Sequence, residues 1–485
     1  MKKKKEKILV IGLGISGKSA INLLLKEKKE VVAIDARFDK IKEEKEIIQL
    51  KKRGVKIFSD DKTSFILWEE IALIVTSPGV LPSHKFLQIG KEKNIEIIGE
   101  IELAARYIKN ICVGITGTNG KTTLTELISF ILNKKNIPSK VLGNIGTSLS
   151  SYILNREKEN DVKEKNILEE KNDLQYKKEE VLIIELSSFQ LEKIKSSFLQ
   201  YAVILNIAPD HLDWHGSYEK YSLAKCKIER LLKKRGKLFI NEKIRKKYFA
   251  KKKYEKIITF EDISENENIF FGKTEDFFEF FEKKKTEKNK INNKKSYKKI
   301  KDKKHPQIFL GKDILLAAYG VCKNFGVTKE EFLFCCKKYK KNKHRIEFIA
   351  EINGIFIYND SKATNPAAVD YAIGQFDQPI ILIAGGKDKK MSYEKWKYSF
   401  KDKVKKIYLI GETAKKIKTA LNRNHVTIEK NLKEAVKGAF LSAKKNDVIL
   451  FSPGCSSFDM FKNYEHRGNE FKSLVSHLEK EEKIL

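Results

Sequence analysis

Residues 111-ICVGITGTNGKTT-123 decide which class of fold this chain adopts. A short apolar run enters a glycine-rich turn, and apolar residues at helical spacing follow it. This order presents backbone N–H groups to phosphates, while Lys121 adds a cation and Thr122 a hydroxyl that can bind a metal. Five residues separate Gly114 from Gly120, so the spacing differs from the usual GxxxxGK[ST]. We therefore predict a parallel α/β domain that binds ATP or GTP with Mg²⁺.

A second glycine-rich turn lies upstream. Gly12-Leu-Gly14-Ile-Ser-Gly17 follows an apolar run and opens a helical pattern, and Asp35 ends the next apolar run. This is the context of a dinucleotide-binding turn, although any nucleotide diphosphate would suit it. Asp35 is either a ribose-binding acid or a residue that forms the turn after the strand. A nucleotide-dependent dehydrogenase is one alternative, but it leaves residues 111–123 and the last third of the chain unexplained.

The rest of the chain continues the alternation of strand and helix patterns. Val181–Leu186 and Tyr201–Ile207 are continuous apolar runs, as expected of strands buried on both faces. A third α/β pattern begins near His344. We predict that Asn155–Glu180 is a surface loop or an extension and that the Lys-rich stretch Glu282–Pro306 is mobile.

The predicted fold class is α/β with three domains. Their order is a Rossmann-like domain at residues 1–108, a central P-loop parallel sheet at 109–343, and a Rossmann-like α/β domain at 344–485.

Composition excludes several classes of protein. The chain has 485 residues, 41% of them hydrophobic, so it can form a core and is not disordered throughout. No apolar run approaches the roughly 18 residues of a membrane span, and we predict neither a membrane segment nor a signal peptide. The six cysteines show no metal-site spacing, which indicates reduced thiols in the cytoplasm.

The net charge of 98 − 65 = +33 raises the alternative of a basic P-loop ATPase that acts on nucleic acid. The lysines lack the interleaved aromatic residues of a stacking surface, so we expect no nucleic-acid partner.

Further polar clusters follow apolar runs of the central region. Glu185 ends a predicted strand, where it could hold Mg²⁺ through oxygen. Asn206–Gly216 contains two His and two Asp and ends the next strand, which also favours a metal site. Lys225 lies on a helix predicted over Tyr218–Leu232, and composition alone makes it a solvent-exposed lysine.

The last third gathers hydroxyls, amides and cations at the ends of several predicted strands. Four segments share this property: His344–Glu347, Tyr358–Asn365, Gly385–Lys389 and Ser452–Ser457. They would suit a carboxylated or phosphorylated substrate. Cys455 is more simply a small buried thiol than a nucleophile, because no His is placed beside it by the sequence.

Taken together, these segments resemble the motifs of the Mur ligase family, most closely its D-glutamate-adding type. The matching segments are Gly114–Thr123 (GITGTNGKTT), Gly143–Gly146 (GNIG), Glu185–Glu192 (ELSSFQLE), Asn206–Gly216 (NIAPDHLDWHG), Asn359–Asn365 (NDSKATN) and Ser452–Phe471 (SPGCSSFDMFKNYEHRGNEF). The first is shared with folylpolyglutamate ligases, whereas ELSSFQLE, NDSKATN and the last segment point to the D-glutamate type. Two features depart from the family pattern: its HNxxN stretch is shortened here to Leu310–Ala318, and Tyr464 stands where Phe is expected.

The resemblance implies a set of binding residues. The UDP part of the substrate would contact Ile15, Ser16, Arg37 and Gly79, and its muramoyl-alanine part Asn144 and Gln190. ATP would be bound by Gly117, Thr118, Asn119, Gly120, Lys121, Thr122, Thr123, Arg345 and Asp360. D-Glutamate would be bound by Lys362, Thr364, Lys389, Ser457 and Tyr464. Two Mg²⁺ ions would be held by Thr122, Glu185, His211 and Lys225, the last carrying a carbamate formed with CO₂. The catalytic residues would be Lys121, Glu185, His211 and Lys225.

The resemblance also implies an activity. It is the ATP-dependent joining of D-glutamate to UDP-N-acetylmuramoyl-L-alanine through an acyl phosphate, in the cytoplasmic synthesis of peptidoglycan precursors. We expect a monomer without a membrane or nucleic-acid partner. A ligase of the same family that uses another amino acid, or a folate, is the nearest alternative.

Overall fold

The computed structural model describes residues 6–61, 66–156, 179–250, 256–266, 269–273, 278–282, 310–339, 343–389, 391–400 and 403–482. Most of the two predicted loops, Asn155–Glu180 and Glu282–Pro306, lies outside these residues, so their predicted character is not tested. The chain divides into two compact units. The first comprises Met1–Ile207, Ser222–Phe260 and Ala317–Lys337, and the second comprises Ala208–Tyr221, Glu261–Leu316 and Lys338–Leu485. Domain boundaries at 108 and 343 stay a prediction.

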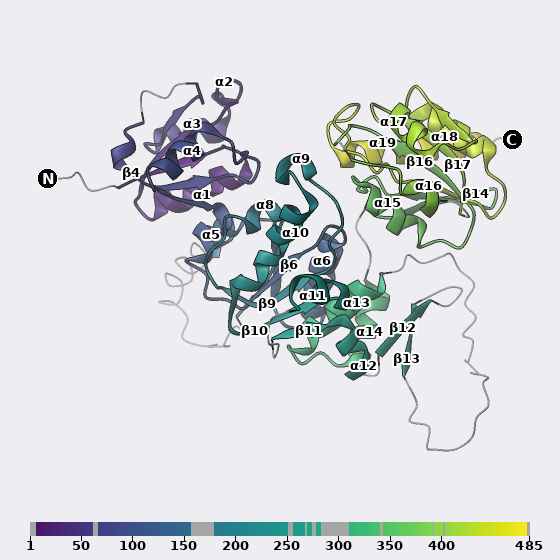
Figure 1. The fold of residues 1–485 in the computed structure, drawn as a ribbon, viewed down its shortest axis with the longest axis horizontal. Helices are drawn as coiled ribbons and strands as arrows, with labels where there is room; N and C mark the ends of the chain where they lie inside the picture. Colours follow the sequence, from purple (N-terminus) through teal and green to yellow (C-terminus); the bar gives the residue numbers. More distant parts are fainter. Residues whose placement is uncertain are drawn as a thin grey trace, which may run out of the picture. The chain divides into compact units, whose positions relative to one another are not determined.

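The N-terminal sheet of the first unit has five parallel strands in the order β3-β2-β1-β4-β5. Figure 1 draws this region in purple to blue. The strands are β1 (Lys7–Ile11), β2 (Glu30–Ile34), β3 (Lys56–Phe58), β4 (Ile71–Thr76) and β5 (Glu96–Gly99). The helices are α1 (Ile15–Lys26), α2 (Phe38–Ile41), α3 (Lys45–Lys52), α4 (Lys85–Glu92) and α5 (Glu100–Ala105), with a 3-10 turn η1 (Trp68–Glu70). The sheet order reverses beside β1, so the turn after this strand opens at a topological switch point.

The central sheet of the first unit has six parallel strands in the order β11-β10-β9-β6-β8-β7. The strands are β6 (Cys112–Thr116), β7 (Ser139–Gly143), β8 (Val181–Glu185), β9 (Leu199–Ile204), β10 (Leu232–Ile240) and β11 (Ile257–Thr259). Helices of the central region are α6 (Lys121–Lys134), α8 (Ser188–Leu191), α9 (Leu212–His215), α10 (Tyr218–Cys226), α11 (Glu242–Tyr248), α12 (Phe260–Asn266), α13 (Lys312–Lys323) and α14 (Lys329–Lys338), with a 3-10 turn η2 (Lys227–Leu231). A separate antiparallel pair is formed by β12 (Ile269–Lys273) and β13 (Phe278–Glu282).

Two buried carboxylates of α5 attach the N-terminal sheet to the central region within the first unit. Glu100 Oε1 accepts from the backbone N of Ser150 (2.7 Å). Glu102 Oε2 accepts from the backbone N of Lys195 (2.8 Å) and of Ser196 (2.9 Å). Burial by itself would raise the pKa of Glu102, but these hydrogen bonds outweigh it and the pKa is lowered. Glu102 is therefore an ionised anchor at neutral pH.

The sheet of the second unit has six strands in the order β14-β15-β19-β16-β17-β18, and all its pairs are parallel except β14 with β15. The strands are β14 (Glu347–Ile352), β15 (Ile355–Asn359), β16 (Ile380–Gly385), β17 (Val404–Ile410), β18 (Val426–Ile428) and β19 (Val448–Phe451). The helices are α15 (Pro366–Ile373), α16 (Trp396–Ser399), α17 (Ala414–Leu421), α18 (Leu432–Ser442) and α19 (Tyr464–Glu482). The predicted Rossmann-like α/β region is confirmed, with one antiparallel edge strand added.

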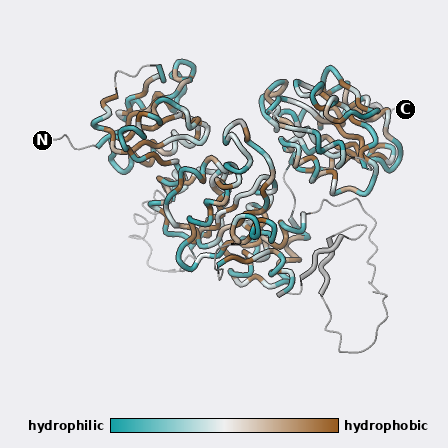
Figure 2. The backbone as a smooth tube through the Cα atoms, viewed as in Figure 1, coloured by the Kyte–Doolittle hydropathy of each residue, from teal (hydrophilic) through white to brown (hydrophobic). Residues whose placement is uncertain are grey.

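Buried apolar residues explain why these runs form strands. Along β16, Leu382 belongs to one buried cluster and its neighbours Ile381 and Ile383 belong to another, so the strand is covered on both faces. Figure 2 shows hydrophobic segments running through the interior of each folded region. All six cysteines are free thiols in the structure. Among the described residues, no helix has the length and apolar character required to cross a bilayer.

Candidate active site

The glycine-rich turn after β6 is braced by one asparagine from the end of β9. Asn206 Oδ1 accepts from the backbone N of Thr118 (3.1 Å) and of Asn119 (2.9 Å), and its Nδ2 donates to Asn119 O (2.9 Å). Gly120 then adopts φ +81° and starts α6 at Lys121, a conformation that favours glycine. The turn is thereby held between a strand end and a helix start, as the sequence predicts for a phosphate-binding loop.

Lys121 and Lys225 meet at one backbone oxygen of this turn. Lys121 Nζ donates to Gly117 O (2.8 Å) and to Thr118 O (3.0 Å), and Lys225 Nζ donates to Gly117 O (2.8 Å). Lys225 is buried, with 2% of its surface exposed. The expectation from composition that it is solvent-exposed is therefore wrong, because α10 directs it onto the loop. The helix predicted over Tyr218–Leu232 is also corrected: α10 ends at Cys226 and continues as the 3-10 turn η2.

Glu185 ends β8, as predicted, and is buried with 2% of its surface exposed. Its Oε1 accepts from Asn144 Nδ2 (2.9 Å). Its Oε2 is buried and accepts no hydrogen bond from any residue that the structure describes. A buried carboxylate oxygen without a donor is costly unless something positive binds it. Hard cations such as Mg²⁺ prefer such oxygens, so Glu185 fits the predicted metal ligand.

The His- and Asp-rich segment after β9 does not form a metal cluster by itself. His211 adopts φ +51°, its backbone N donates to Asp210 Oδ1 (2.9 Å), and its Nε2 lies 3.6 Å from Asp210 Oδ2. Over the described part of the chain, no group of three or more His, Cys, Asp or Glu side chains could hold a metal. His211 belongs to the second unit and Glu185 to the first, so a shared metal stays a prediction.

A cleft of about 670 Å³ opens beside the first glycine-rich turn. The four residues predicted to contact UDP, namely Ile15, Ser16, Arg37 and Gly79, all line it. Sequence reasoning missed Ser77 and His84, which also line it. Ser77 follows β4 as Gly12 follows β1, and its Oγ donates to Gly12 O (2.8 Å). Its position at a neighbouring strand end is the signal that could have found it.

Asp35 ties the strand end to this turn. Its Oδ2 accepts from the backbone N of Leu13 (2.6 Å), and its Oδ1 accepts from the backbone N of Arg37 (2.7 Å). Burial by itself would raise the pKa of Asp35, but hydrogen bonds from the Arg37 side chain and both amides outweigh it, so the pKa is lowered. The sequence left open whether Asp35 binds a ribose or forms the turn after the strand. These hydrogen bonds favour the role in the turn.

The predicted muramoyl-alanine contacts, Asn144 and Gln190, lie in the first unit. Gln190 is buried, and its Oε1 accepts from the backbone N (2.8 Å) and the Oγ (3.0 Å) of Ser187 at the start of α8. Its carbonyl is therefore used to cap a helix.

Asp360, predicted for the nucleotide, is held at the end of β15. Its Oδ1 accepts from the backbone N of Ile346 (3.2 Å), next to the predicted Arg345, and its Oδ2 accepts from Ser452 Oγ (2.7 Å). Ile346 has φ +46°, a strained conformation for a β-branched residue. Such strain persists only where surrounding contacts impose it.

Of the residues predicted for D-glutamate, the structure pairs Lys362 with Tyr464, whose ring centroid lies 4.9 Å from Lys362 Nζ. Ser457 is buried in the loop after β19. Thr364 and Lys389 follow β15 and β16, and their roles stay predictions.

Cys455 is confirmed as a buried thiol. Its Sγ lies 3.0 Å from Tyr393 Oη and 3.2 Å from Thr413 Oγ1, and 1% of the residue is exposed. Burial raises the pKa of this thiol, which disfavours the thiolate that a nucleophile would need.

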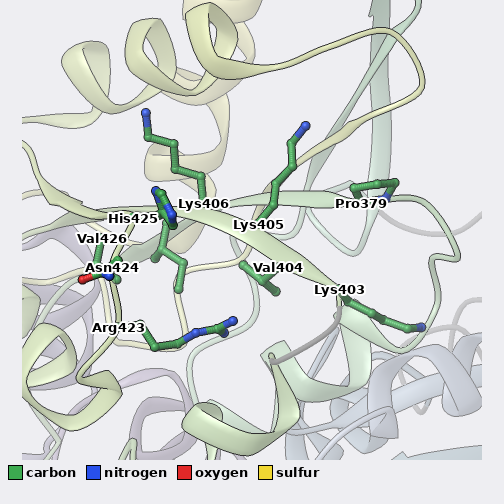
Figure 3. Close-up of a pocket in the computed structure, with 10 residues that line it drawn as sticks. Pro379, Lys403, Val404, Lys405, Lys406, Arg423, Asn424, His425 and Val426 are labelled. Atoms are coloured by element: carbon green, nitrogen blue, oxygen red, sulfur yellow. The ribbon is translucent and has the colours of Figure 1, made fainter.

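A second cleft, of about 410 Å³, lies at the amino ends of strands in the sheet of the second unit and is lined by several basic residues. It is lined by the starts of β17 and β18 and includes Lys403, Lys405, Lys406 and Arg423. Figure 3 shows that Lys405 and Lys406 point away from Arg423. Lys405 is paired with Asp447, and Lys403 Nζ donates to Phe376 O (2.7 Å). No residue predicted for a substrate lines this cleft, because those residues follow the carboxyl ends of the strands.

Comparison with known proteins identifies the family. Residues 6–99 match the N-terminal domain of MurD-like Mur ligases, residues 115–307 the Mur ligase middle domain, and residues 344–455 the glutamate ligase domain of Mur ligases. The UDP-N-acetylmuramoylalanine–D-glutamate ligase of Protochlamydia amoebophila is 38% identical over 476 residues, which cover 97% of this chain and 98% of that relative. The chain belongs to the Mur ligase family. The ligase of the same name from Caldicellulosiruptor bescii is 37% identical over 487 residues, covering 98% of each chain.

Solved structures of other Mur ligases share the fold. The MurF ligase of Thermotoga maritima in complex with ADP has a TM-score of 0.53 at 16% identity, covering 98% of this chain and 96% of that chain. MurF of Acinetobacter baumannii has a TM-score of 0.53 at 14% identity, covering 88% and 87%. At these identities the likeness establishes the fold alone, and it confirms the predicted α/β fold of three Mur ligase domains.

Proposed function

We propose that this Mur ligase joins D-glutamate to UDP-N-acetylmuramoyl-L-alanine and converts ATP to ADP and phosphate. The observation that carries the proposal is the near full-length identity to relatives named for this reaction. The cleft beside the first glycine-rich turn supports it, because it gathers all four residues expected to contact UDP. The reaction would belong to cytoplasmic peptidoglycan synthesis, and hence to cell shape and division, with the enzyme acting as a monomer.

The chemistry proceeds in two steps. The alanyl carboxylate attacks the γ-phosphorus of ATP, the bond to the β-phosphate oxygen breaks, and ADP leaves an acyl phosphate behind. The amine of D-glutamate then attacks the acyl carbon. A C–N bond forms, the C–O bond to phosphate breaks, and phosphate and the amine proton depart. ATP thereby converts a poor acyl donor into a good one.

The glycine-rich loop would bind the ATP phosphates. Its amides lie at the start of α6, where the helix dipole favours an anion. Lys121 would exchange its contacts with Gly117 O and Thr118 O for phosphate oxygens. A fixed cation there stabilises the charge that develops on the transferred phosphoryl group. Arg345 and Asp360 would contact the nucleotide from the C-terminal domain.

Mg²⁺ would be held by Thr122, Glu185, His211 and carbamylated Lys225, and it would neutralise charge on the phosphates. The buried Oε2 of Glu185 fits this role, since it lacks a hydrogen-bond donor within the described residues. Carbamylation joins the Lys225 amine to CO₂ with release of a proton. It thereby replaces an ammonium by an anionic oxygen donor.

Phosphate release tests the proposal most directly. The purified chain is incubated with ATP, Mg²⁺ and UDP-N-acetylmuramoyl-L-alanine, and a panel of D- and L-amino acids is added one at a time. Release that requires both the UDP substrate and D-glutamate supports the proposal. Release with L-lysine or a diamino acid instead moves the chain to another type of Mur ligase. Release that depends on neither substrate, or is stimulated by nucleic acid, overturns it.

A further inference from the structure

Arg467 is the largest charged side chain buried in the structure, with 0% of its surface exposed. It lies in the first turn of α19 and points into the carboxyl edge of the C-terminal sheet. Its Nε donates to Ser361 Oγ (3.0 Å) and its Nη2 to Ser361 O (2.7 Å). Its Nη1 donates to Cys455 O (3.1 Å) and to Ser456 O (3.2 Å). One guanidinium thus binds two separate loops.

The charge of Arg467 is not balanced by an ion pair. Among the described residues, no carboxylate lies within ion-pair distance of it, and all four acceptors are neutral oxygens. Burial lowers the pKa of Arg467 to about 10, so the side chain still carries its charge at neutral pH. Asp459 and Asp360 act on this charge only from beyond ion-pair distance, and a buried charge without a direct ion-pair partner is costly for the fold. A role in function would explain why the site keeps it.

The residues that Arg467 binds are neighbours of the predicted D-glutamate residues. Ser361 precedes Lys362, and Ser456 precedes Ser457. Ser361 Oγ also donates to Tyr464 O (2.8 Å), which joins the start of α19 to the same network. Three of the five predicted D-glutamate residues are therefore connected to this network. Lys362 and Ser457 are chain neighbours of Ser361 and Ser456, and Tyr464 accepts a hydrogen bond from Ser361.

A third loop packs against the same group. The backbone N of Lys387 donates to Ser456 O (2.9 Å), the oxygen that Arg467 Nη1 also binds. A Cβ atom on Gly386 would lie 2.4 Å from Ser456 O and 3.2 Å from Arg467 Nη1. The loop after β16, which contains Gly386 and Lys389, thus packs so close to the guanidinium that a side chain at position 386 would not fit.

We propose that Arg467 is a positioning residue for the amino-acid substrate. It fixes the relative positions of the loops after β15, β16 and β19, so that Lys362, Ser457 and Tyr464 can contact the two carboxylates of D-glutamate. This role rests on the proposed function for the identity of the amino acid. Arg467 differs from the five residues predicted to contact D-glutamate, because it acts on the substrate only through Ser361 and Ser456.

The test is the steady-state kinetics of Arg467→Lys and Arg467→Gln in the full chain. Misplacement of binding groups by about 1 Å lowers the reaction rate by up to about 100-fold. We therefore expect the KM for D-glutamate to rise about tenfold or more. The KM values for ATP and for the UDP substrate should stay within about twofold. Arg467→Lys keeps the charge and should recover part of the loss. Hydroxylamine trapping of the acyl phosphate without D-glutamate should give hydroxamate at the wild-type rate.

Two further variants keep the test decisive. Ser361→Ala removes only the Oγ between Arg467 and Tyr464, so it tests the network even where Arg467→Gln fails to fold. Arg423→Gln is the matched control, because it removes a half-buried arginine from the opposite edge of the same sheet, and its kinetics should equal those of the wild type. Equal rises in all three KM values, or loss of hydroxamate formation, would overturn the positioning role. A wild type that uses another amino acid would overturn the proposed function alone, and the same comparison would then be made with that amino acid.

Discussion

Asn144 is joined to Glu185 by two hydrogen bonds. The backbone N of Asn144 donates to Glu185 O (2.9 Å), and its Nδ2 donates to Glu185 Oε1 (2.9 Å). The turn after β7 thereby fixes one carboxylate oxygen of Glu185, and the other oxygen stays buried without a donor among the described residues. A residue predicted for the UDP substrate therefore orients a residue predicted for the metal.

Glu185→Gln should separate activity from stability. We expect kcat to fall by about 100-fold or more, because several kcal/mol of charge stabilisation depend on an anionic ligand. The free energy of unfolding without Mg²⁺ should not fall, since a costly buried charge is removed. Phosphate release across Mg²⁺ concentrations and thermal unfolding measure the two effects. Glu219→Gln changes an exposed carboxylate of α10 and should behave like the wild type; equal activity of the two variants would exclude Glu185 as a metal ligand.

Lys225→Arg tests the carbamate. Arginine keeps the positive charge but does not form a carbamate with CO₂ at neutral pH, so we expect activity to fall by about 100-fold. With ¹³C-bicarbonate, the wild type should show a carbamate ¹³C resonance that is missing from the variant. Lys220→Arg alters an exposed lysine of the same helix and should keep both activity and resonance. A resonance that survives in Lys225→Arg would assign the carbamate elsewhere.

Asp35→Asn should destabilise the N-terminal turn in a pH-dependent way. Because the folded pKa of Asp35 lies below its unfolded value of about 3.9, its stabilisation is present above that pH and is lost as the pH falls through the folded pKa. Arg37 is largely exposed, so the two backbone amides carry most of the effect. We expect a loss of about 1–2 kcal/mol at pH 7.

Denaturant unfolding of wild type and Asp35→Asn at pH 7 and pH 3 measures this difference. The difference between the two proteins should be smaller at pH 3 than at pH 7. Asp39→Asn, at an exposed position nearby, should show no difference at either pH, and a gap as large at pH 3 as at pH 7 would rule out ionisation as its cause.

Gly17→Ala should damage the UDP cleft. A Cβ at Gly17 would lie 1.8 Å from Gly12 O, so α1 must shift away from the turn. We expect a loss of about 1–3 kcal/mol in unfolding free energy and a higher KM for the UDP substrate, with ATP binding unchanged. For Gly14→Ala, whose Cβ meets nothing within 4 Å, stability should equal that of the wild type. Titration with a fluorescent ATP analogue and denaturant unfolding provide the measurements.

Local patterns predicted much of the candidate site. The turns after β1 and β6 combine glycines with a strand and a helix, and their geometry depends on residues close in sequence. Glu185 was predicted for the same reason, because it ends an apolar run typical of a buried strand, whereas the role of Asp360 was implied by the family resemblance. Ser77 and His84 were missed, since their approach to the UDP cleft depends on the pairing of β4 with β1.

The sequence by itself determined the α/β class, the two glycine-rich turns and the family, because these depend on short segments whose order along the chain is enough. Only the tertiary structure decided which polar groups are buried and what each one contacts. It brought Lys225 from an apparently exposed helix position onto Gly117 O, left Glu185 Oε2 without a donor, and enclosed Arg467 between Ser361 and Ser456. The physical reason is that burial and hydrogen bonding depend on residues far apart in the sequence, such as Lys225 and Gly117 at a separation of 108 positions, which no local pattern encodes.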